Sequence, residues 1–365
     1  MEKEKEAWQS MIKGMDISMI KTLEEQGACY YLNGVKKDIF RILKECGVNM
    51  IRLRLWYDPY SDGGAAYGGG GNDLETTIEL AKRTAENGME LLLDLHYSDF
   101  WADPSKQIKP KAWEGLCGAK LQRAVYKYTA ETLRRFRAEG VSPAMVQVGN
   151  EITNGLLWPD GKVENVEEMA KLLSEGIRAV RETAPESRIV FHLDFGTDNR
   201  LYRKWFTDIS PYQLDYDVIG MSYYPYWNGS MEELFYNMND ISKTFGKQVL
   251  VAETAMGYTT DTLGCSGIVF SKEQETASGY PATLEGQEAF LRDLYGTVRK
   301  VEDKKGIGVF YWEPAWLPIA SCTWAEKDGR EYMNDQAEAG NSMANQALFD
   351  AEGNANPALT HLGTM

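Results

Sequence analysis

The feature that most constrains this fold is a regular alternation between short apolar runs and longer amphipathic stretches along the chain. Short apolar runs are typical of buried strands, and apolar residues spaced three and four apart are typical of helices. The strand candidates are residues 12–17, 48–55, 90–95, 144–148, 188–193, 216–222, 248–252 and 307–312. The helix candidates between them are residues 35–46, 74–87, 124–139, 166–182, 231–245 and 285–301. Strands that alternate with helices predict a parallel sheet.

Eight parallel strands can close into a barrel or form an open doubly wound sheet. No linker rich in Pro, Gly or Ser divides the chain, which favours one barrel over two domains. No GxGxxG motif follows the first strand, and we interpret the Gly-rich residues 63–71 as a mobile loop. We therefore predict an α/β fold, a single (β/α)8 TIM barrel over residues 1–365. Residues 1–10 form a solvated N-terminal extension in this interpretation, and the active site lies at the C-terminal ends of the strands.

Composition restricts the possible partners of such a barrel. The formal charge of −15 would repel phosphate backbones, so we expect neither nucleic acid nor an anionic membrane surface as a partner. A neutral polymer is compatible with this charge, and 10 Trp and 20 Tyr supply flat rings on which sugars stack. Three His residues and five Cys residues without a CxxC pair argue against a His-rich metal centre, a zinc ribbon or a disulfide framework. We expect a monomer without a cofactor or a metal.

Polar and aromatic residues follow almost every predicted strand. In a (β/α)8 barrel the reactive groups sit at these strand ends, so they should share one rim. The residues at the ends of the second to eighth strands are Arg52, Arg54, Trp56, Asp94, His96, Asp99, Asn150, Glu151, His192, Asp194, Tyr223, Tyr224, Glu253, Trp312, Glu313 and Trp316.

Glu151 and Glu253 are the strongest catalytic candidates, because each ends an otherwise apolar run. A lone carboxylate at a strand end is more often a helix cap or a salt-bridge partner. Two of them on the fourth and seventh strands face each other across a barrel and can flank a glycosidic bond. One must stay protonated to donate to the leaving oxygen while the other stays ionised, so their surroundings must differ. A retaining pair would have its carboxyl groups about 5 to 5.5 Å apart.

Several neighbours have both a structural and a functional interpretation. Arg52 and Tyr223 can hold one glutamate as the anion, although Arg52 can equally pair with Asp16 or Asp94. Asn150 can bind the sugar 2-hydroxyl. His96 and His192 are either satisfied polar residues inside the barrel or groups that orient the catalytic residues. Trp312 and Trp316 are either core residues or sugar platforms, and Pro314 between them favours a platform on a loop.

At this point the chain resembles glycoside hydrolase family 53, the endo-β-1,4-galactanases, within the clan of retaining barrel enzymes. The resemblance runs from Lys13-Gly-Met-Asp16 to Asn345-Gln-Ala-Leu-Phe-Asp350. Its sharpest pieces are Asn49-Met-Ile-Arg52-Leu-Arg54-Leu-Trp56, the segment from Asp94 through His96 to Pro104, Gly149-Asn150-Glu151-Ile-Thr153-Asn154-Gly155 and Tyr311-Trp312-Glu313-Pro314-Ala-Trp316. The segment from His96 to Pro104 is highly specific to the family, whereas Asn-Glu alone is shared by the clan.

The resemblance implies Glu151 as acid/base and Glu253 as nucleophile. It also implies that the cleaved subsite is lined by Arg52, His96, Asn150, His192, Tyr223 and Trp312, and that neighbouring galactose subsites contain Asp194, Asp198, Trp101 and Trp316. Two departures stand out. The chain has Ser342-Met343 where relatives have Ser-Trp, which weakens one expected stacking contact. Residues 256–281 carry few carboxylates, so the calcium site of some relatives is not predicted.

The expected function is hydrolysis of internal β-1,4-galactosidic bonds in galactan, type I arabinogalactan or galacto-oligosaccharides, with retention of configuration. The alternatives are another β-1,4-glycanase of the clan, such as a mannanase or cellulase, and a carbohydrate-binding barrel that has lost catalysis. The residues after Met1 show no apolar core of signal-peptide length, which favours the cytoplasm. The alternative is an exported protein whose signal peptide has been removed.

Overall fold

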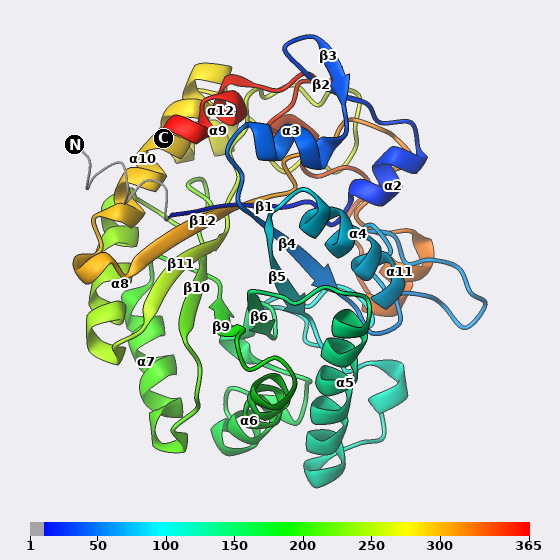
Figure 1. Cartoon of the computed structure of the whole chain (residues 1–365), viewed down its shortest axis with the longest axis vertical. Helices are drawn as coiled ribbons and strands as arrows, with labels where there is room; N and C mark the ends of the chain where they lie inside the picture. Colours follow the sequence, from blue (N-terminus) through cyan, green and yellow to red (C-terminus); the bar gives the residue numbers. More distant parts are fainter. Residues whose placement is uncertain (1–10) are drawn as a thin grey trace.

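Eight parallel strands close into a barrel in the computed structural model, which describes residues 11–365 (Figure 1). The strands are β1 (Ile12–Asp16), β4 (Met50–Leu55), β5 (Glu90–Leu95), β6 (Met145–Val148), β9 (Arg188–Leu193), β10 (Val218–Ser222), β11 (Gln248–Glu253) and β12 (Gly306–Trp312). Their order around the barrel is β1-β12-β11-β10-β9-β6-β5-β4. The predicted strands and the predicted barrel are confirmed. The extension expected at residues 1–10 lies outside the described residues.

Helices surround this barrel on its outer side (Figure 1). The longer ones are α3 (Ile39–Glu45), α4 (Leu74–Glu86), α5 (Gly118–Ala138), α6 (Val166–Thr183), α7 (Asn199–Ile209), α8 (Met231–Phe245) and α10 (Leu284–Arg299). Shorter ones are α2 (Ile20–Glu25), α9 (Lys272–Ser278), α11 (Lys327–Met333) and α12 (Pro357–Thr360). Within residues 11–365, none is long and apolar enough to cross a membrane.

The loops at both ends of the barrel contain short elements. Two antiparallel hairpins are formed by β2 (Tyr30–Leu32) with β3 (Val35–Lys37) and by β7 (Gly155–Leu156) with β8 (Gly161–Lys162). The single 3-10 turns are η1 (Lys111–Trp113), η2 (Ile152–Asn154), η3 (Ser210–Tyr212), η4 (Glu302–Lys304), η5 (Ala344–Gln346) and η6 (Leu362–Thr364).

The structure corrects the start of two predicted helices and adds one of the longer helices. The predicted helix 35–46 begins later, because Val35–Lys37 pair with β2 and the Asp38 side chain caps α3 by accepting from the backbone N–H of Phe40 and Arg41. Helix α5 begins at Gly118 rather than near residue 124. Helix α7 was not predicted. Helix α8 has its predicted bounds and ends at Gly246, whose φ of 74° suits a residue without a side chain.

The lower half of the barrel interior is apolar. This cluster contains Ile12, Met50, Leu92, Met145, Val190, Val218, Leu250, Ala252 and Phe310. The ring of Phe310 lies against Gly14, where an added Cβ would come within 2.2 Å of Phe310 Cδ1. The glycine therefore leaves room for this ring, which helps to fill the barrel beneath the polar residues.

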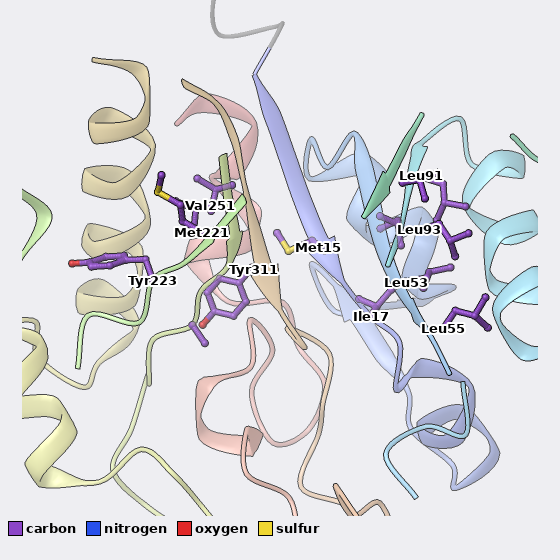
Figure 2. Packing of buried hydrophobic residues seen from close by; sticks show 14 of the residues in the cluster. Met15, Ile17, Leu53, Leu55, Leu91, Leu93, Met221, Tyr223, Val251 and Tyr311 are labelled. Atoms are coloured by element: carbon purple, nitrogen blue, oxygen red, sulfur yellow. The ribbon is translucent and has the colours of Figure 1, made fainter. Parts of the chain in front are cut away.

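Side chains alternate between the interior and the surrounding helices along each strand. Figure 2 shows Leu53, Leu91 and Leu93 on one side of the barrel, and Met221 and Val251 on another, pointing away from the interior into the layer beneath the helices. Residues next to them in sequence must point inward. Arg52, one residue before Leu53, is accordingly buried within the barrel at 1% exposure.

Removing the large ring at the bottom of the barrel should destabilise the protein. We expect Phe310→Ala to lower the free energy of unfolding by about 3–5 kcal/mol, because it leaves a cavity in a closed layer. Chemical denaturation monitored by circular dichroism measures this change. The control is Tyr236→Ala, at a side chain that is 60% exposed. A loss for Phe310→Ala of less than about 1 kcal/mol would contradict this account of the layer.

Candidate active site

A cleft of about 690 Å³ opens at the carboxyl ends of the barrel strands. It lies above the apolar layer, where the inward positions of the strands are polar. The predicted site residues that line it are Arg52, His96, Trp101, Asn150, Glu151, Asp194, Glu253 and Trp312. Residues at the ends of six different strands and in the loops that follow them thus contribute to one concave surface.

Glu253 ends strand β11 and lies beside a buried cation. Its Oε1 is 2.9 Å from Nη2 of Arg52, and Tyr224 donates its hydroxyl to Oε2 at 3.2 Å. The same guanidinium contacts Asp16 and Asp94, both at 2.8 Å. Arg52 is therefore both the structural ion-pair partner and the contact of the glutamate, so its two interpretations hold together.

Glu151 follows strand β6 and has no such cation. Within residues 11–365 it forms no ion pair, and its polar contact is the Ser222 hydroxyl, 2.6 Å from Oε1. Its backbone has the left-handed values φ 45° and ψ 51°, which are costly for a residue with a side chain and are concentrated at functional sites. This conformation places the carboxyl in the cleft that Glu253 also lines.

The two carboxyls differ in their electrostatic surroundings. Burial raises the pKa of Glu151 well above its usual value, and the negative charges of Glu253 and Asp194 raise it further. Burial also raises the pKa of Glu253, to about 7, but the guanidinium of Arg52 acts in the opposite direction. Because only Glu253 contacts a cation, it loses its proton first. Glu151 then keeps its proton beside a negative neighbour.

The histidines occupy different depths. His96 lines the cleft, and its Nδ1 accepts from the indole of Trp56 at 3.1 Å and from the backbone N–H of Ala102 at 3.2 Å. Its Nε2 therefore carries a proton, which it donates to Asp94 at 3.0 Å. His192 is fully buried beneath the cleft and contacts Asn150 rather than the open space.

Two tryptophans form one wall of the cleft. The rings of Trp101 and Trp312 have centroids 6.1 Å apart and are tilted toward each other. Arg54 lies over the Trp101 ring at 4.5 Å, and the Trp101 indole donates to the Trp324 carbonyl at 2.9 Å. These contacts fix the orientation of Trp101. Fixed rings of this kind can stack on the apolar face of a sugar.

Besides His192, three predicted site residues do not line the cleft. Tyr223 points outward (Figure 2), donates its hydroxyl to the Gly229 carbonyl at 3.0 Å and packs near Phe290 of α10. Side-chain alternation along β10 is the reason, because Ser222 faces inward and Tyr223 therefore faces the helices. The next residue, Tyr224, faces inward again and contacts Glu253.

Trp316 and Asp198 also need correction. Trp316 is fully buried, donates its indole N–H to the Cys322 carbonyl at 3.3 Å and packs behind Trp312 instead of lining the cleft. The loop after β12 folds back over the ring, so the core interpretation of Trp316 is the right one. Asp198 accepts from the backbone N–H of Leu201 at 2.9 Å, and this contact caps helix α7.

Two residues with exposed rings that were not predicted from the sequence also line the cleft. Phe195 is 49% exposed and Trp227 is 56% exposed, and both line the cleft on the side of Glu151. Phe195 directly follows Asp194, and Trp227 ends the aromatic run after Ser222. Aromatic residues that follow a strand end were the available signal. Met343, where a stacking Trp was expected, also lines the cleft but is only 3% exposed.

The site consists of protein groups suited to acid–base and nucleophilic chemistry. Across residues 11–365, no three His, Cys, Asp or Glu side chains are grouped so that they could hold a metal ion. The five cysteines are unpaired thiols. The arrangement presents one carboxylate beside a cation and one carboxyl that holds a proton. This combination can displace a glycosidic oxygen and protonate it as it leaves.

Comparison with known proteins agrees with this chemistry. The sequence profile of glycosyl hydrolase family 53 matches residues 12–362. An endo-beta-1,4-galactanase of Bacillus subtilis is 40% identical, with 95% of this chain and 84% of that protein covered. The catalytic domain of a family 53 protein of Ignisphaera aggregans superposes with a TM-score of 0.90 at 40% identity, covering 97% of this chain and 96% of that one. A fungal beta-1,4-galactanase structure superposes with a TM-score of 0.78 at 29% identity, covering 96% and 98%. The chain belongs to glycosyl hydrolase family 53.

Proposed function

We propose that this chain hydrolyses internal β-1,4-galactosidic bonds of galactan or type I arabinogalactan as a monomer, with retention of configuration. Glu253 is the nucleophile and Glu151 is the acid/base. The observation that carries the assignment is the contrast between the two carboxyls, since Arg52 contacts Glu253 while Glu151 has only a hydroxyl. The galactan substrate rests on the activity that the names of the relatives state.

The two carboxyls act in a double displacement. Glu253 attacks the anomeric carbon while Glu151 gives its proton to the leaving oxygen, which leaves a glycosyl ester on Glu253. Ester formation removes the negative charge of Glu253, so the pKa of Glu151 falls. Glu151 is then a base that takes a proton from water as the water oxygen attacks the anomeric carbon and Glu253 departs. The same two groups thus serve both steps.

Asn150 and the tryptophans hold the sugar at the cleaved bond. The Asn150 amide donates one N–H to the Ala102 carbonyl at 2.8 Å, and its second N–H is available to the sugar 2-hydroxyl. A contact there strengthens as positive charge develops on the ring. Trp312 supplies an apolar face beside the same position.

The cleft extends to both sides of the glutamates, which supports endo action. Trp101 and Trp312 lie at one side, and Phe195 and Trp227 lie at the side of Glu151. Glu151 protonates the leaving oxygen, so the departing part of the chain lies over Phe195 and Trp227. A polymer bound on both sides is cut internally.

Azide rescue separates the roles of the two glutamates. We expect Glu151→Ala to lower galactan hydrolysis by about 10²- to 10⁴-fold, and Glu253→Ala to lower it at least as much. With a dinitrophenyl galactobioside and azide, Glu151→Ala should give the β-galactosyl azide, because Glu253 still forms the intermediate. Glu253→Ala should give the α-azide by direct attack. NMR of the products decides, and near-native galactan hydrolysis by either variant would exclude the pair.

Parallel assays with the wild-type chain test the substrate. Galactan should be hydrolysed, while mannan and cellulose should not, because the axial C4 oxygen of galactose gives its polymer a different path through the cleft. Preferred hydrolysis of mannan or cellulose would indicate another glycanase. Tight galactan binding without product after long incubation would indicate a binding protein.

The charge of Glu253 should set the pKa of Glu151. We expect Glu253→Gln to lower the pKa of Glu151, because it removes the negative neighbour that disfavours ionisation. Carbon-13 NMR of labelled glutamate carboxyls measures this value, with Glu151→Gln identifying the resonance. The matched control is Glu164→Gln at an exposed position, which should leave the resonance unchanged. An unchanged or raised pKa in Glu253→Gln would contradict the coupling.

Trp227 should act on the leaving part of the polymer. We expect Trp227→Ala to lower kcat/KM on long galactan by about tenfold, the loss of one stacking contact. On dinitrophenyl galactobioside, hydrolysis of the glycosyl ester should be the rate-limiting step. The leaving group has departed by then, so Trp227→Ala should not change kcat. Tyr236→Ala, at an exposed ring outside the cleft, is the control. An equal loss of kcat on both substrates would place Trp227 on the other side of the bond.

A further inference from the structure

A chain of buried hydrogen bonds runs beneath the cleft and ends on Glu151. The Ser222 hydroxyl is 2.6 Å from Oε1 of Glu151 and 2.9 Å from Nε2 of His192. The other ring nitrogen, Nδ1 of His192, is 2.9 Å from Oδ1 of Asn150. Arg52 donates to the same Oδ1 at 2.8 Å, which connects the chain to the cation of the site.

His192 is the neutral residue at the centre of this series of hydrogen bonds. It is fully buried, and burial lowers its pKa well below the usual value, with a further lowering by the charge of Arg52. The other ionisable groups that act on it are Asp94, which opposes this shift, and His96. A neutral imidazole carries one proton, so one ring nitrogen donates and the other accepts.

Asn150 decides which nitrogen carries the proton. Its Nδ2 donates to the Ala102 carbonyl, so its Oδ1 is the atom that faces His192. An unprotonated Nδ1 would place two lone pairs 2.9 Å apart, whereas a protonated Nδ1 donates a normal hydrogen bond to Oδ1. The Gln147 amide nitrogen also lies 3.2 Å from Nδ1, but its two protons go to Oδ1 of Asp94 at 2.6 Å and to Oδ1 of Asn150 at 3.0 Å. Nε2 is then an acceptor, and the group within its reach is the Ser222 hydroxyl.

The single hydroxyl proton of Ser222 thus has two alternative acceptors. While Glu151 holds its proton, Ser222 can donate to Nε2 of His192 and accept the proton of the Glu151 carboxyl, so that every donor in the chain points the same way. Once Glu151 has given up its proton, the Ser222 hydroxyl can rotate and donate to the carboxylate. This charge-assisted bond is stronger than the bond to His192 that it replaces.

We propose that Ser222, oriented by His192, is a positioning residue that holds Glu151 in both of its protonation states. It accepts from the acid while the cleft is empty, and it donates to the carboxyl once the acid proton has turned toward the leaving oxygen and throughout the second step. No proton leaves Ser222 or His192 in this exchange, because only the hydroxyl rotates. The inference rests on the proposed role of Glu151 and assigns these two residues a function that needs no contact with the sugar.

The variants Ser222→Ala and Ser222→Thr test this role. The Ala variant removes the donor to the carboxylate, so the pKa of Glu151 and the alkaline limb of kcat/KM should move to higher pH. We expect kcat on galactan to fall about ten- to a hundredfold with little change in KM, since Ser222 does not hold the sugar. The Thr variant keeps the hydroxyl and should restore both the alkaline limb and most of kcat.

The other charged groups that face Glu151 are the same in wild type and in both variants, so they do not contribute to a difference in the pKa of Glu151. They are Glu253 on β11, Asp194 after β9 and Asp103 after β5. A shifted alkaline limb that Thr reverses therefore reports the hydroxyl itself. The proposal would be overturned if the alkaline limb of kcat/KM did not shift in Ser222→Ala. It would also be overturned if Ser222→Thr did not restore kcat.

The tautomer of His192 gives a second measurement that does not depend on galactan. Nitrogen-15 NMR of the wild-type protein should show the proton on Nδ1 at a pH where Glu151 is protonated. A proton on Nε2 there would overturn the proposal. A failure of the proposed function is distinguishable, because it would show as galactan hydrolysis that survives Glu151→Ala, whatever Ser222 and His192 do.

Discussion

The buried guanidinium of Arg52 is the interaction on which the rest of the site depends. Removing such a charge from water costs several kcal/mol, and the structure offsets this cost with three carboxylates within 2.9 Å, those of Asp16, Asp94 and Glu253. They come from β1, β5 and β11, so the cation joins three strands inside the barrel. The contact that keeps Glu253 anionic is therefore part of the packing of the barrel, and it exists before substrate arrives.

The position of this cation also explains why two similar glutamates can have opposite roles. One guanidinium faces three carboxylates, so the interior is short of positive charge and burial raises the pKa of Glu253 even with Arg52 beside it. Glu151 does not contact this cation. The negative charges of Glu253 and Asp194 therefore raise its pKa, and no positive charge lowers it. In the proposed mechanism, distance from Arg52 thus decides which carboxyl attacks and which holds the proton. The proposed role of Ser222 follows, because its hydroxyl then faces an acid and a carboxylate in turn.

The sequence predicted the strands and their polar ends because both depend on local pattern. A residue after a buried parallel strand must lie at the barrel rim, which is why Glu151 and Glu253 were found. The errors arose where a side chain's position depends on register or on loop packing. Tyr223 and Tyr224 differ by one step of alternation along β10, and Trp316 is buried only because the loop after β12 folds over it. Phe195 has no periodic signal, and its place after the strand end at Asp194 was the one sequence feature that pointed to the cleft.

Alternation also explains how one strand supports both stability and chemistry. Along β4, Met50 lies in the apolar layer, Arg52 reaches Glu253, and Arg54 lies over the Trp101 ring at 4.5 Å while pairing with Glu313 at 2.6 Å. The two arginines therefore contact the proposed nucleophile and the proposed sugar platform respectively. A lysine at either position would keep the charge but lose the planar fork that contacts several groups at once. The geometry of the guanidinium, more than its charge, lets a single strand position both Glu253 and Trp101.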